Sequence, residues 1–286
     1  MSHDHPSGST KTWFITGTSS GLGRAFAEYA LARGYNVVAT ARNVAKMQDL
    51  AAAHPADRLL ITQLDVEQPH EAKAAVDAAV ARFGRIDVLI NNAGYALVGA
   101  LEETPDAELR AVMNTNFFGA MTMTRAVLPV LRAQRSGAIV NISSLGGQLS
   151  FAGFSAYSAS KFALEGASEA LAEEVAAFGI KVLIVEPGQF RTELAGGGLR
   201  HMPIIEAYQD VVGNARTFAH DMHQTQPGDP RKAALAIDQA LDAEKTPLRL
   251  QLGDDAIDAI RGHAQTLLAD MAAWEKLSRA TSFESA

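Results

Sequence analysis

The 286-residue sequence contains no cysteine, and this absence excludes several classes of protein. Without thiols the chain can form neither disulfides nor thiolate metal sites, and nothing points to an oxidising compartment. No run of about 18 apolar residues occurs, so a membrane span is not expected. The first ten residues are polar and lack the apolar segment of a secretory signal. We therefore expect a cytoplasmic protein in which residues 1–10 form a disordered tail.

Clustered positive charge is also lacking, because acidic residues outnumber basic ones and give a formal net charge of −7. Nucleic-acid binding needs grouped Lys and Arg side chains, so nucleic acid is not an expected partner. The composition, 48% hydrophobic and 20% charged, is ordinary for a globular protein. No boundary, repeat or low-complexity segment divides the chain. We predict one domain over residues 11–286 and no metal site.

Short apolar runs alternate with helical patterns along the chain. The runs are continuously apolar, which is typical of parallel strands covered on both faces. We expect an α/β fold, a Rossmann-like doubly wound parallel sheet of about seven strands with helices on both faces. The predicted strands are residues 13–16, 35–41, 59–64, 86–90, 138–142, 181–185 and 248–252. The predicted helices are residues 24–33, a segment ending at 53, and residues 69–83, 105–135, 157–178, 231–242 and 255–278.

A glycine-rich turn, residues 17–23 (GTSSGLG), follows the first predicted strand and precedes a helix. In this arrangement backbone N–H groups and a helix N-terminus bind a pyrophosphate. The spacing G-x-x-x-G-x-G differs from the commoner dinucleotide fingerprint G-x-G-x-x-G. Polar residues follow other predicted strands, at 65–66, 91–94, 143–144 and 187–188. Ligands of parallel sheets bind at this carboxyl edge, so these segments indicate one site.

Tyr157 and Lys161 stand four residues apart, which would place them on one face of a helix. A phenol ionises near pH ~10, and lowering its pKa to ~7 takes roughly 4 kcal/mol. An ammonium about 4 Å away supplies on the order of that energy at an effective dielectric of ~20. A position in the first helical turn would add to it. We expect Lys161 to lower the pKa of Tyr157, which would then donate and accept protons at neutral pH.

These motifs, taken in order, resemble the short-chain dehydrogenase/reductase family. The resemblance extends from about residue 12 to about residue 195 and rests on the glycine-rich turn, the NNAG segment at 91–94 and Tyr157-x-x-x-Lys161. Within the family the chain looks like the NADP-dependent hydroxysteroid- and retinol-dehydrogenase-like branch of carbonyl reductases. The resemblance implies a Rossmann-like fold and an oxidoreductase that transfers a hydride between NADP(H) and a small-molecule carbonyl or alcohol.

The resemblance implies four catalytic residues. Tyr157 would protonate the carbonyl oxygen during reduction, and Lys161 would lower its pKa and bond the nicotinamide ribose. Ser144 would hold the substrate oxygen. Asn116 would position a water that connects Lys161 to solvent. The alternatives that stay open are Ser143 for Ser144 and Asn114 for Asn116.

The resemblance also implies an NADP(H) site, in which Asp65 would accept from the adenine amino group and Thr192 would meet the nicotinamide carboxamide. At the end of the second strand Ala41 replaces the acidic residue that selects NAD. The next residue, Arg42, can bond a 2′-phosphate, the alternative being a solvated loop arginine. The predicted cofactor-binding residues are Gly17, Ser19, Ser20, Gly21, Leu22, Gly23, Arg42, Asp65, Val66, Asn92, Gly94, Tyr157, Lys161, Pro187, Gly188 and Thr192.

Residues 189–226 interrupt the alternation and carry many large apolar residues, which favours a mobile substrate lid over a linker. Phe190 stands where many relatives have a smaller aliphatic residue, and would narrow the nicotinamide pocket or wall off the substrate. An apolar ketone, aldehyde or secondary alcohol would suit the surroundings of the catalytic centre. The apolar residues expected to flank this centre are Tyr95, Leu97, Val98, Leu149, Phe151 and Phe154.

Two other functions stay open. A catalytically silent NADP(H)-binding regulator would keep the fold, although such proteins generally lose part of the catalytic tetrad. A lyase or epimerase would usually carry a longer carboxyl domain. The resemblance further implies a homodimer formed through helices 105–135 and 157–178. The final helix, 255–278, would cover the sheet edge that tetramers use.

Overall fold

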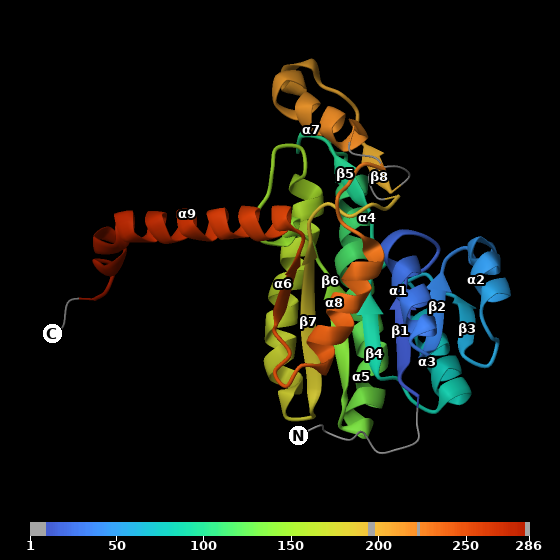
Figure 1. Ribbon diagram of the computed structural model, residues 1–286. Helices are drawn as coiled ribbons and strands as arrows, with labels where there is room; N and C mark the ends of the chain where they lie inside the picture. Colours follow the sequence, from blue (N-terminus) through green and yellow to red (C-terminus); the bar gives the residue numbers. More distant parts are fainter. Residues whose placement is uncertain (1–9, 194–197, 222–223, 284–286) are drawn as a thin grey trace.

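A parallel seven-stranded sheet forms the centre of the computed structural model, which describes residues 10–193, 198–221 and 224–283 (Figure 1). The strand order is β3-β2-β1-β4-β6-β7-β9, and every neighbouring pair is parallel. The order reverses between β1 and β4, and this reversal is where ligands of such sheets bind. The predicted doubly wound α/β fold is confirmed. The strands are β1 (Thr12–Thr16), β2 (Asn36–Ala41), β3 (Leu59–Gln63), β4 (Val88–Asn91), β6 (Gly137–Ile142), β7 (Ile180–Pro187) and β9 (Arg249–Leu252).

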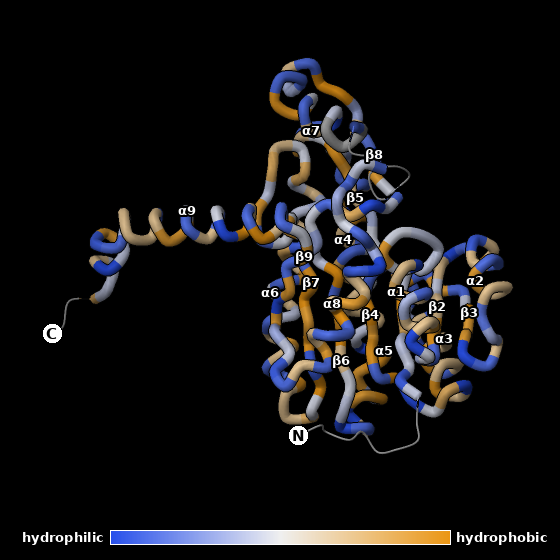
Figure 2. The backbone as a smooth tube through the Cα atoms, in the orientation of Figure 1, coloured by the Kyte–Doolittle hydropathy of each residue, from blue (hydrophilic) through white to orange (hydrophobic). Residues whose placement is uncertain are grey.

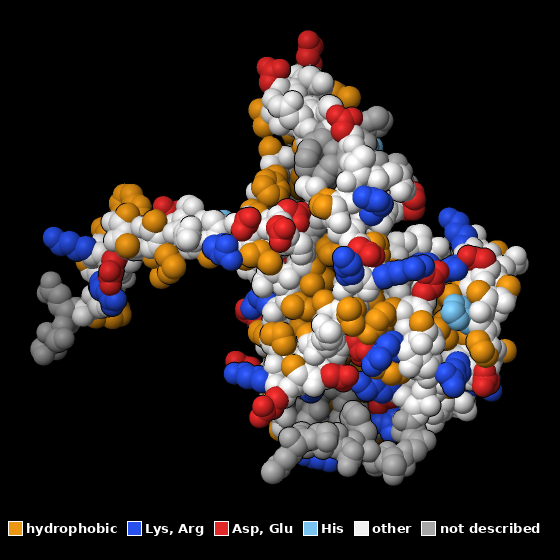
Figure 3. All heavy atoms as spheres, in the orientation of Figure 1, with side chains coloured by type: hydrophobic (Ala, Val, Ile, Leu, Met, Phe, Trp, Pro, Cys, Tyr) orange, Lys and Arg blue, Asp and Glu red, His pale blue; other side chains and the backbone are white. Residues whose placement is uncertain are grey.

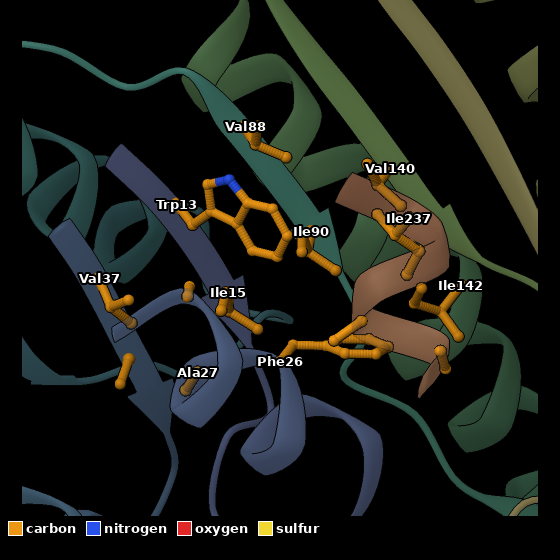
Figure 4. Close-up of a cluster of buried hydrophobic side chains, with 14 of the residues drawn as sticks. Trp13, Ile15, Phe26, Ala27, Val37, Val88, Ile90, Val140, Ile142 and Ile237 are labelled. Atoms are coloured by element: carbon orange, nitrogen blue, oxygen red, sulfur yellow. The ribbon is translucent and has the colours of Figure 1, made fainter. Parts of the chain in front are cut away.

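Helices cover both faces of the sheet because successive strand residues point to opposite sides. Trp13 and Ile15 of β1 pack with Phe26 and Ile237 in one core (Figure 4), whereas Phe14 packs in the other core. The first core lies under α1 (Gly21–Ala32) and α8 (Pro230–Asp242). The second lies under α3 (Pro69–Phe83), α5 (Gly119–Gln134) and α6 (Ser155–Ala176). The strands can therefore be apolar throughout.

The helix predicted over residues 105–135 is present without a gap from Asp106 to Gln134, but it contains a π-helical turn. It consists of α4 (Asp106–Met113), a π-helical turn (Asn114–Phe118) and α5. A π turn inserts one extra residue and leaves the apolar pattern on either side unchanged, so periodicity could not reveal it. The turn buries Asn116, whereas Asn114 stays exposed.

A second, two-stranded sheet was not predicted. Its strands are β5 (Ala96–Val98) and β8 (Leu199–His201), which pair in parallel. α7 (Gln209–Asp221) contributes Val212 to a small core with Val98. The described part of the predicted lid is therefore attached to the segment that follows β4.

A buried ion pair fastens the same region. Arg216 of α7 lies 2.6 Å from the Glu103 carboxylate, and both side chains are almost fully buried. Glu103 also accepts hydrogen bonds from the backbone N–H groups of Ala100 (2.7 Å) and Ile205 (2.8 Å). These bonds lower the pKa of Glu103, the bond from Ile205 having the largest effect. The base of the segment that was predicted to be a lid is thus held by hydrogen bonds.

The last helix, α9 (Asp254–Arg279), projects away from the body (Figure 1). Ala256 at its start is buried, whereas every described residue from 264 to 283 is exposed. The expectation that this helix covers the edge of the sheet is wrong, because only its first turns contact the body. None of the described helices, α9 included, has the length and apolar character needed to cross a membrane.

Two carboxyl groups are buried where α6 meets β7 and β9. Arg249 Nε lies 3.0 Å from Oε2 of Glu165 and 3.2 Å from Oε1 of the fully buried Glu186. Gln251 donates to Oε2 of Glu186 at 2.5 Å, but Oε1 of each carboxyl accepts no hydrogen bond. Burial, and then the neighbouring Glu165, raise the pKa of Glu186 to about 7. Arg249 thus contacts both buried carboxyl groups.

The raised pKa of Glu186 predicts a pH-dependent stability. Between the ordinary value of 4.5 and about 7 the folded chain holds a proton that the unfolded chain releases, so this stabilisation is lost as pH rises through 7. Glu186→Gln removes the titrating group. The free energy of unfolding of the variant, relative to wild type, should therefore increase from about pH 5 to about pH 8, by at most roughly 3 kcal/mol.

Urea unfolding at both pH values measures this difference. The control is Glu169→Gln, which removes an exposed carboxylate that also contacts Arg249, at 2.6 Å. The control should show little change with pH. A Glu186→Gln difference that stays constant with pH would show that this carboxyl titrates normally.

Candidate active site

A cavity of about 570 Å³ opens at the carboxyl ends of β1, β4, β6 and β7. It brings together residues that the sequence analysis selected from separate strand ends. Of the predicted site residues, Gly23 and Asn116 lie outside its lining. Those that line it are Gly17, Ser19, Ser20, Gly21, Leu22, Arg42, Asp65, Val66, Asn92, Gly94, Ser144, Tyr157, Lys161, Pro187, Gly188 and Thr192.

The glycine-rich turn needs its glycines for backbone conformation and space. Gly17 and Gly21 have φ angles of +70° and +60°, which side chains disfavour. A Cβ on Gly23 would collide with the Gly17 carbonyl oxygen. Ser20 precedes α1 without capping it by its side chain, so the first-turn N–H groups stay available to an anion. The turn therefore fits the pyrophosphate of a dinucleotide.

Asn92 holds the turn in place. Its Nδ2 donates to the carbonyl oxygens of Thr16 (2.9 Å) and Gly17 (3.1 Å). In return, Thr16 Oγ1 accepts from the backbone N–H groups of Asn92 (2.9 Å) and Ala93 (3.0 Å). Asn92 lines the cavity as predicted, but both hydrogens of its amide are already used. Its structural effect is to join the end of β4 to the turn after β1.

Two cations lie at the β2 end of the cavity. Arg42 follows β2, and Lys46 belongs to a short 3₁₀ turn, Val44–Met47; both side chains are exposed and line the cavity. Asn43 fixes this turn by accepting from the Ala45 N–H at 3.0 Å. Lys46 was not predicted from the sequence to line this site. The signal available was its place four residues after Arg42, behind an Asn that can cap a turn.

Ser144 and Tyr157 meet in the lining of the cavity. Ser144 follows β6 and accepts from the Gly146 N–H at 3.0 Å, and its hydroxyl also hydrogen-bonds the Tyr157 phenol. Tyr157 lies in the first turn of α6. The Ser143 hydroxyl is buried and has no hydrogen-bond partner. The structure therefore places Ser144, not Ser143, against the phenol.

Lys161 is buried one turn after Tyr157, and its Nζ donates to the Ile142 carbonyl oxygen at 2.8 Å. Nζ lies 5.8 Å from the centre of the Tyr157 ring. Burial lowers the pKa of Lys161 to about 8, against an opposing effect of the Glu165 carboxylate.

Burial also raises the pKa of Tyr157, and only its bond with Ser144 opposes this. The expectation that Lys161 brings the pKa of Tyr157 near 7 is not met by these residues. That expectation included the attraction between an ammonium and a phenolate but left out the loss of hydration on burial. Loss of hydration makes the charged form of each group less stable relative to its neutral form.

Asn116 lies behind the cavity and does not line it. Its Nδ2 donates to the Tyr95 carbonyl oxygen and to Ser160 Oγ, both at 3.0 Å, and its Oδ1 accepts from the Tyr95 N–H at 3.1 Å. The π-helical turn directs this side chain inward, while Asn114 of the same turn is exposed. The structure thus places Asn116, and not Asn114, beside the predicted catalytic residues.

Gly94 lies between Asn116 and Lys161. A Cβ at Gly94 would stand 2.9 Å from Asn116 Oδ1 and 3.8 Å from Lys161 Nζ. Any side chain there would crowd the amide. The absence of one leaves the space between the amide and the ammonium open to the cavity.

The substrate end is more polar than predicted. Of the six apolar residues expected to flank the catalytic centre, Tyr95 alone lines this cavity; Leu97 and Val98 are buried in small cores, and Phe151 is exposed. Phe190 also lines the cavity, in the neighbourhood predicted for it. The lining residues that were not predicted from the sequence are Lys46, Leu64, Thr115, Ile142, Glu193, Gly198 and Arg200.

Arg200 belongs to β8, which the sequence analysis did not find. Its guanidinium stacks over the Tyr95 ring at 4.3 Å and lies 2.9 Å from the Glu108 carboxylate. The Tyr95 hydroxyl is buried without a hydrogen-bond partner. A stacked arginine and a phenol therefore form part of the wall beside the predicted lid.

Comparison with known proteins agrees with this geometry. The family model described as "short chain dehydrogenase" matches residues 11–201 of this chain. The chain is 40% identical to Oxidoreductase BOA17 of Botryotinia fuckeliana, over 95% of this chain and 99% of that protein. It is 39% identical to the 3-ketodihydrosphingosine reductase of Bacteroides thetaiotaomicron, over 84% of this chain and 86% of that protein.

A solved structure of a short-chain dehydrogenase from Streptomyces avermitilis has the same fold. It is 52% identical, with a TM-score of 0.91, over 96% of this chain and 100% of that chain. The family description covers well over half of the sequence, and both ends of the cavity lie within the aligned regions. The chain therefore belongs to the short-chain dehydrogenase family of oxidoreductases.

Proposed function

We propose that the protein is an NADP(H)-dependent oxidoreductase that interconverts a fairly apolar ketone or aldehyde and the corresponding alcohol. The observation that carries the proposal is the position of the Tyr157 phenol, bonded to Ser144 and adjacent to buried Lys161, in the cavity that begins at the glycine-rich turn. The name of the Bacteroides relative, a reductase of a keto compound, supports a ketone as substrate.

The protonation states support reduction at neutral pH. The nicotinamide cofactor, when bound, supplies the hydride that the carbonyl carbon accepts. Because burial raises the pKa of Tyr157, its phenol keeps the proton that the carbonyl oxygen must receive. Ser144 can donate to the same oxygen and hold it in place. Lys161, whose pKa is lowered to about 8, can return a proton to the phenolate through the space beside Gly94.

Tyr157→Phe tests the proton donor. The variant should keep its fold and its affinity for NADPH but lose roughly 10²- to 10⁴-fold in kcat, because general acid catalysis contributes about that much. Oxidation of NADPH by a panel of carbonyl compounds, followed by absorbance, measures turnover, and fluorescence titration measures binding.

Ser143→Ala and Ser144→Ala form a matched pair for the same assay. Ser143→Ala removes a hydroxyl without a hydrogen-bond partner and should keep most of the turnover. Ser144→Ala removes the hydroxyl bonded to Tyr157 and should lose turnover. Retention of more than about a tenth of kcat in Tyr157→Phe would refute the assignment. Tight NADPH binding by wild type, with no turnover of any carbonyl, would instead favour a silent regulatory protein.

The proposed preference for NADP(H) rests on Ala41, Arg42 and Lys46. The end of β2 carries no carboxylate that would repel a 2′-phosphate. Two exposed cations line the cavity there instead. One charge-assisted contact of about 1.5–3 kcal/mol corresponds to roughly a ten- to hundredfold preference. The neutral Ser19 and Ser20 of the glycine-rich turn add no further cation.

Coenzyme kinetics test this preference. Arg42→Ala and Lys46→Ala should each lower kcat/KM for NADPH, by about tenfold or more for Arg42, and leave kcat/KM for NADH nearly unchanged. Ala41→Asp combined with Arg42→Ala should invert the preference, since a carboxylate repels phosphate and accepts from a ribose hydroxyl. A wild-type kcat/KM for NADH equal to or above that for NADPH would contradict the assignment.

We also propose a homodimer formed through α5 and α6. Phe118, at the residue before α5, and Phe162 of α6 are about half exposed. Large apolar side chains on long helices are typical of surfaces that pack against another subunit.

A further inference from the structure

The projecting helix α9 exposes a row of large apolar side chains. Leu267, Met271 and Trp274 are 50%, 69% and 63% exposed. Figure 2 and Figure 3 show hydrophobic residues along the part of α9 that extends beyond the body. No described residue of the chain packs on Leu267, Met271 or Trp274, so this part of the helix lacks the tertiary contacts that normally stabilise helices.

The spacing of the row is that of a helix that pairs lengthwise with another helix. The row, here called the α9 seam, advances by alternating steps of three and four residues, which is the 3.5-residue repeat of a coiled coil. The opposite side of α9 is polar or small, with Gly262 and Ala269 at its middle. The seam consists of Ile257, Ile260, Ala264, Leu267, Met271 and Trp274.

We propose that α9 pairs antiparallel with α9 of a second copy of this chain. An antiparallel pair centred near residues 268–269 places Leu267 against the partner's Met271. The same register places Trp274 against the partner's Ala264, so the largest side chain meets the smallest. Each contact occurs twice by symmetry, which closes the assembly at two copies per α9 pair.

Charge complementarity favours the antiparallel direction. α9 begins with Asp254, Asp255 and Asp258 and ends with Lys276 and Arg279. An antiparallel partner brings the basic end of one helix beside the acidic start of the other, whereas a parallel partner would bring like charges together.

One flank of the seam adds a specific ion pair. In the proposed register Arg261 faces the partner's Glu275, twice per dimer. Within one copy these residues have only exposed contacts, Arg261 with Asp258 at 3.2 Å and Glu275 with Arg279 at 2.7 Å. Such exposed pairs are weak and can be exchanged for contacts across the seam. The unfavourable contact of the register is Asp270 with the partner's Asp270, on the solvated opposite flank.

A membrane surface fits α9 less well than a second copy. Helices that lie on membranes carry a polar face rich in Lys and Arg. The polar face of α9 mixes both signs, with Asp258, Asp270 and Glu275 among the bases. The occupant that matches both the seam and its charges is therefore another α9.

Disulfide trapping tests the register directly, because the chain has no cysteine of its own. Leu268→Cys places two thiols side by side near the proposed twofold axis, and a disulfide forms only where the two Cα atoms come within about 7 Å. Ala269→Cys, the next residue, points away from the seam and is the matched control. Under mild oxidation Leu268→Cys should form a covalent dimer at least about tenfold faster than Ala269→Cys, on non-reducing gels.

Charge exchange provides an independent test. Arg261→Glu and Glu275→Arg should each weaken self-association by roughly two- to thirtyfold at low ionic strength in analytical ultracentrifugation. The double variant should restore it. The two residues lie about 21 Å apart along one helix, so restoration requires contact between copies. If α5 and α6 also form an interface, the step lost is from tetramer to dimer.

Three results would overturn the proposal. The first is equal or absent cross-linking of Leu268→Cys and Ala269→Cys. The second is a double charge variant that associates no better than the single variants. The third is protection of Leu268→Cys from oxidation by vesicles of phosphatidylglycerol and phosphatidylcholine, which would assign the seam to a lipid surface.

Discussion

The ammonium of Lys161 is buried at the carboxyl end of β6, and the rest of the proposed catalytic group depends on its being held there. A buried ammonium is costly unless it is hydrogen-bonded, and the carbonyl oxygen of Ile142 accepts from it. That carbonyl is available because β6 ends at this residue. One turn of α6 then separates Lys161 from Tyr157, so a single strand end and a single helix fix both side chains.

The parallel sheet supplies the remaining parts by the same principle. Each strand ends at one edge, so Gly17, Asn92, Ser144 and Gly188 come together although they lie far apart in sequence. Glycines then permit close approach where side chains would not fit. Gly23 lets α1 approach the Gly17 carbonyl oxygen. The site therefore depends on positions without a side chain as well as on its reactive side chains.

Much of this arrangement could be predicted from the sequence, for identifiable reasons. Apolar runs such as residues 138–142 are typical of parallel strands that are buried on both faces of a sheet. The polar residues that follow such strands therefore lie at the same edge of the sheet. Backbone detail was inaccessible. The π turn around Asn116 and the pairing of β5 with β8 leave no periodic signal, and the cavity lining by Lys46 and Arg200 follows from turns of the chain rather than from motifs.

The predictions of the pKa of Tyr157 and of the path of α9 failed for a different reason. The first depends on how much water the fold removes, which spacing alone cannot give. The second depends on whether a helix finds a partner in its own chain. The heptad spacing of α9 was visible in the sequence, but only the structure shows that no described part of the same chain packs on it.

The most direct test of the central claim is to follow the hydride. Wild-type protein would be incubated with a ketone and NADPH that carries deuterium at the transferable position of nicotinamide C4, and the alcohol analysed by mass spectrometry. The account predicts one deuterium on the carbinol carbon of the product, with the hydroxyl proton coming from exchangeable protein and solvent hydrogens. Alcohol formed without deuterium at that carbon, or with deuterium there only when the solvent is D₂O, would contradict it.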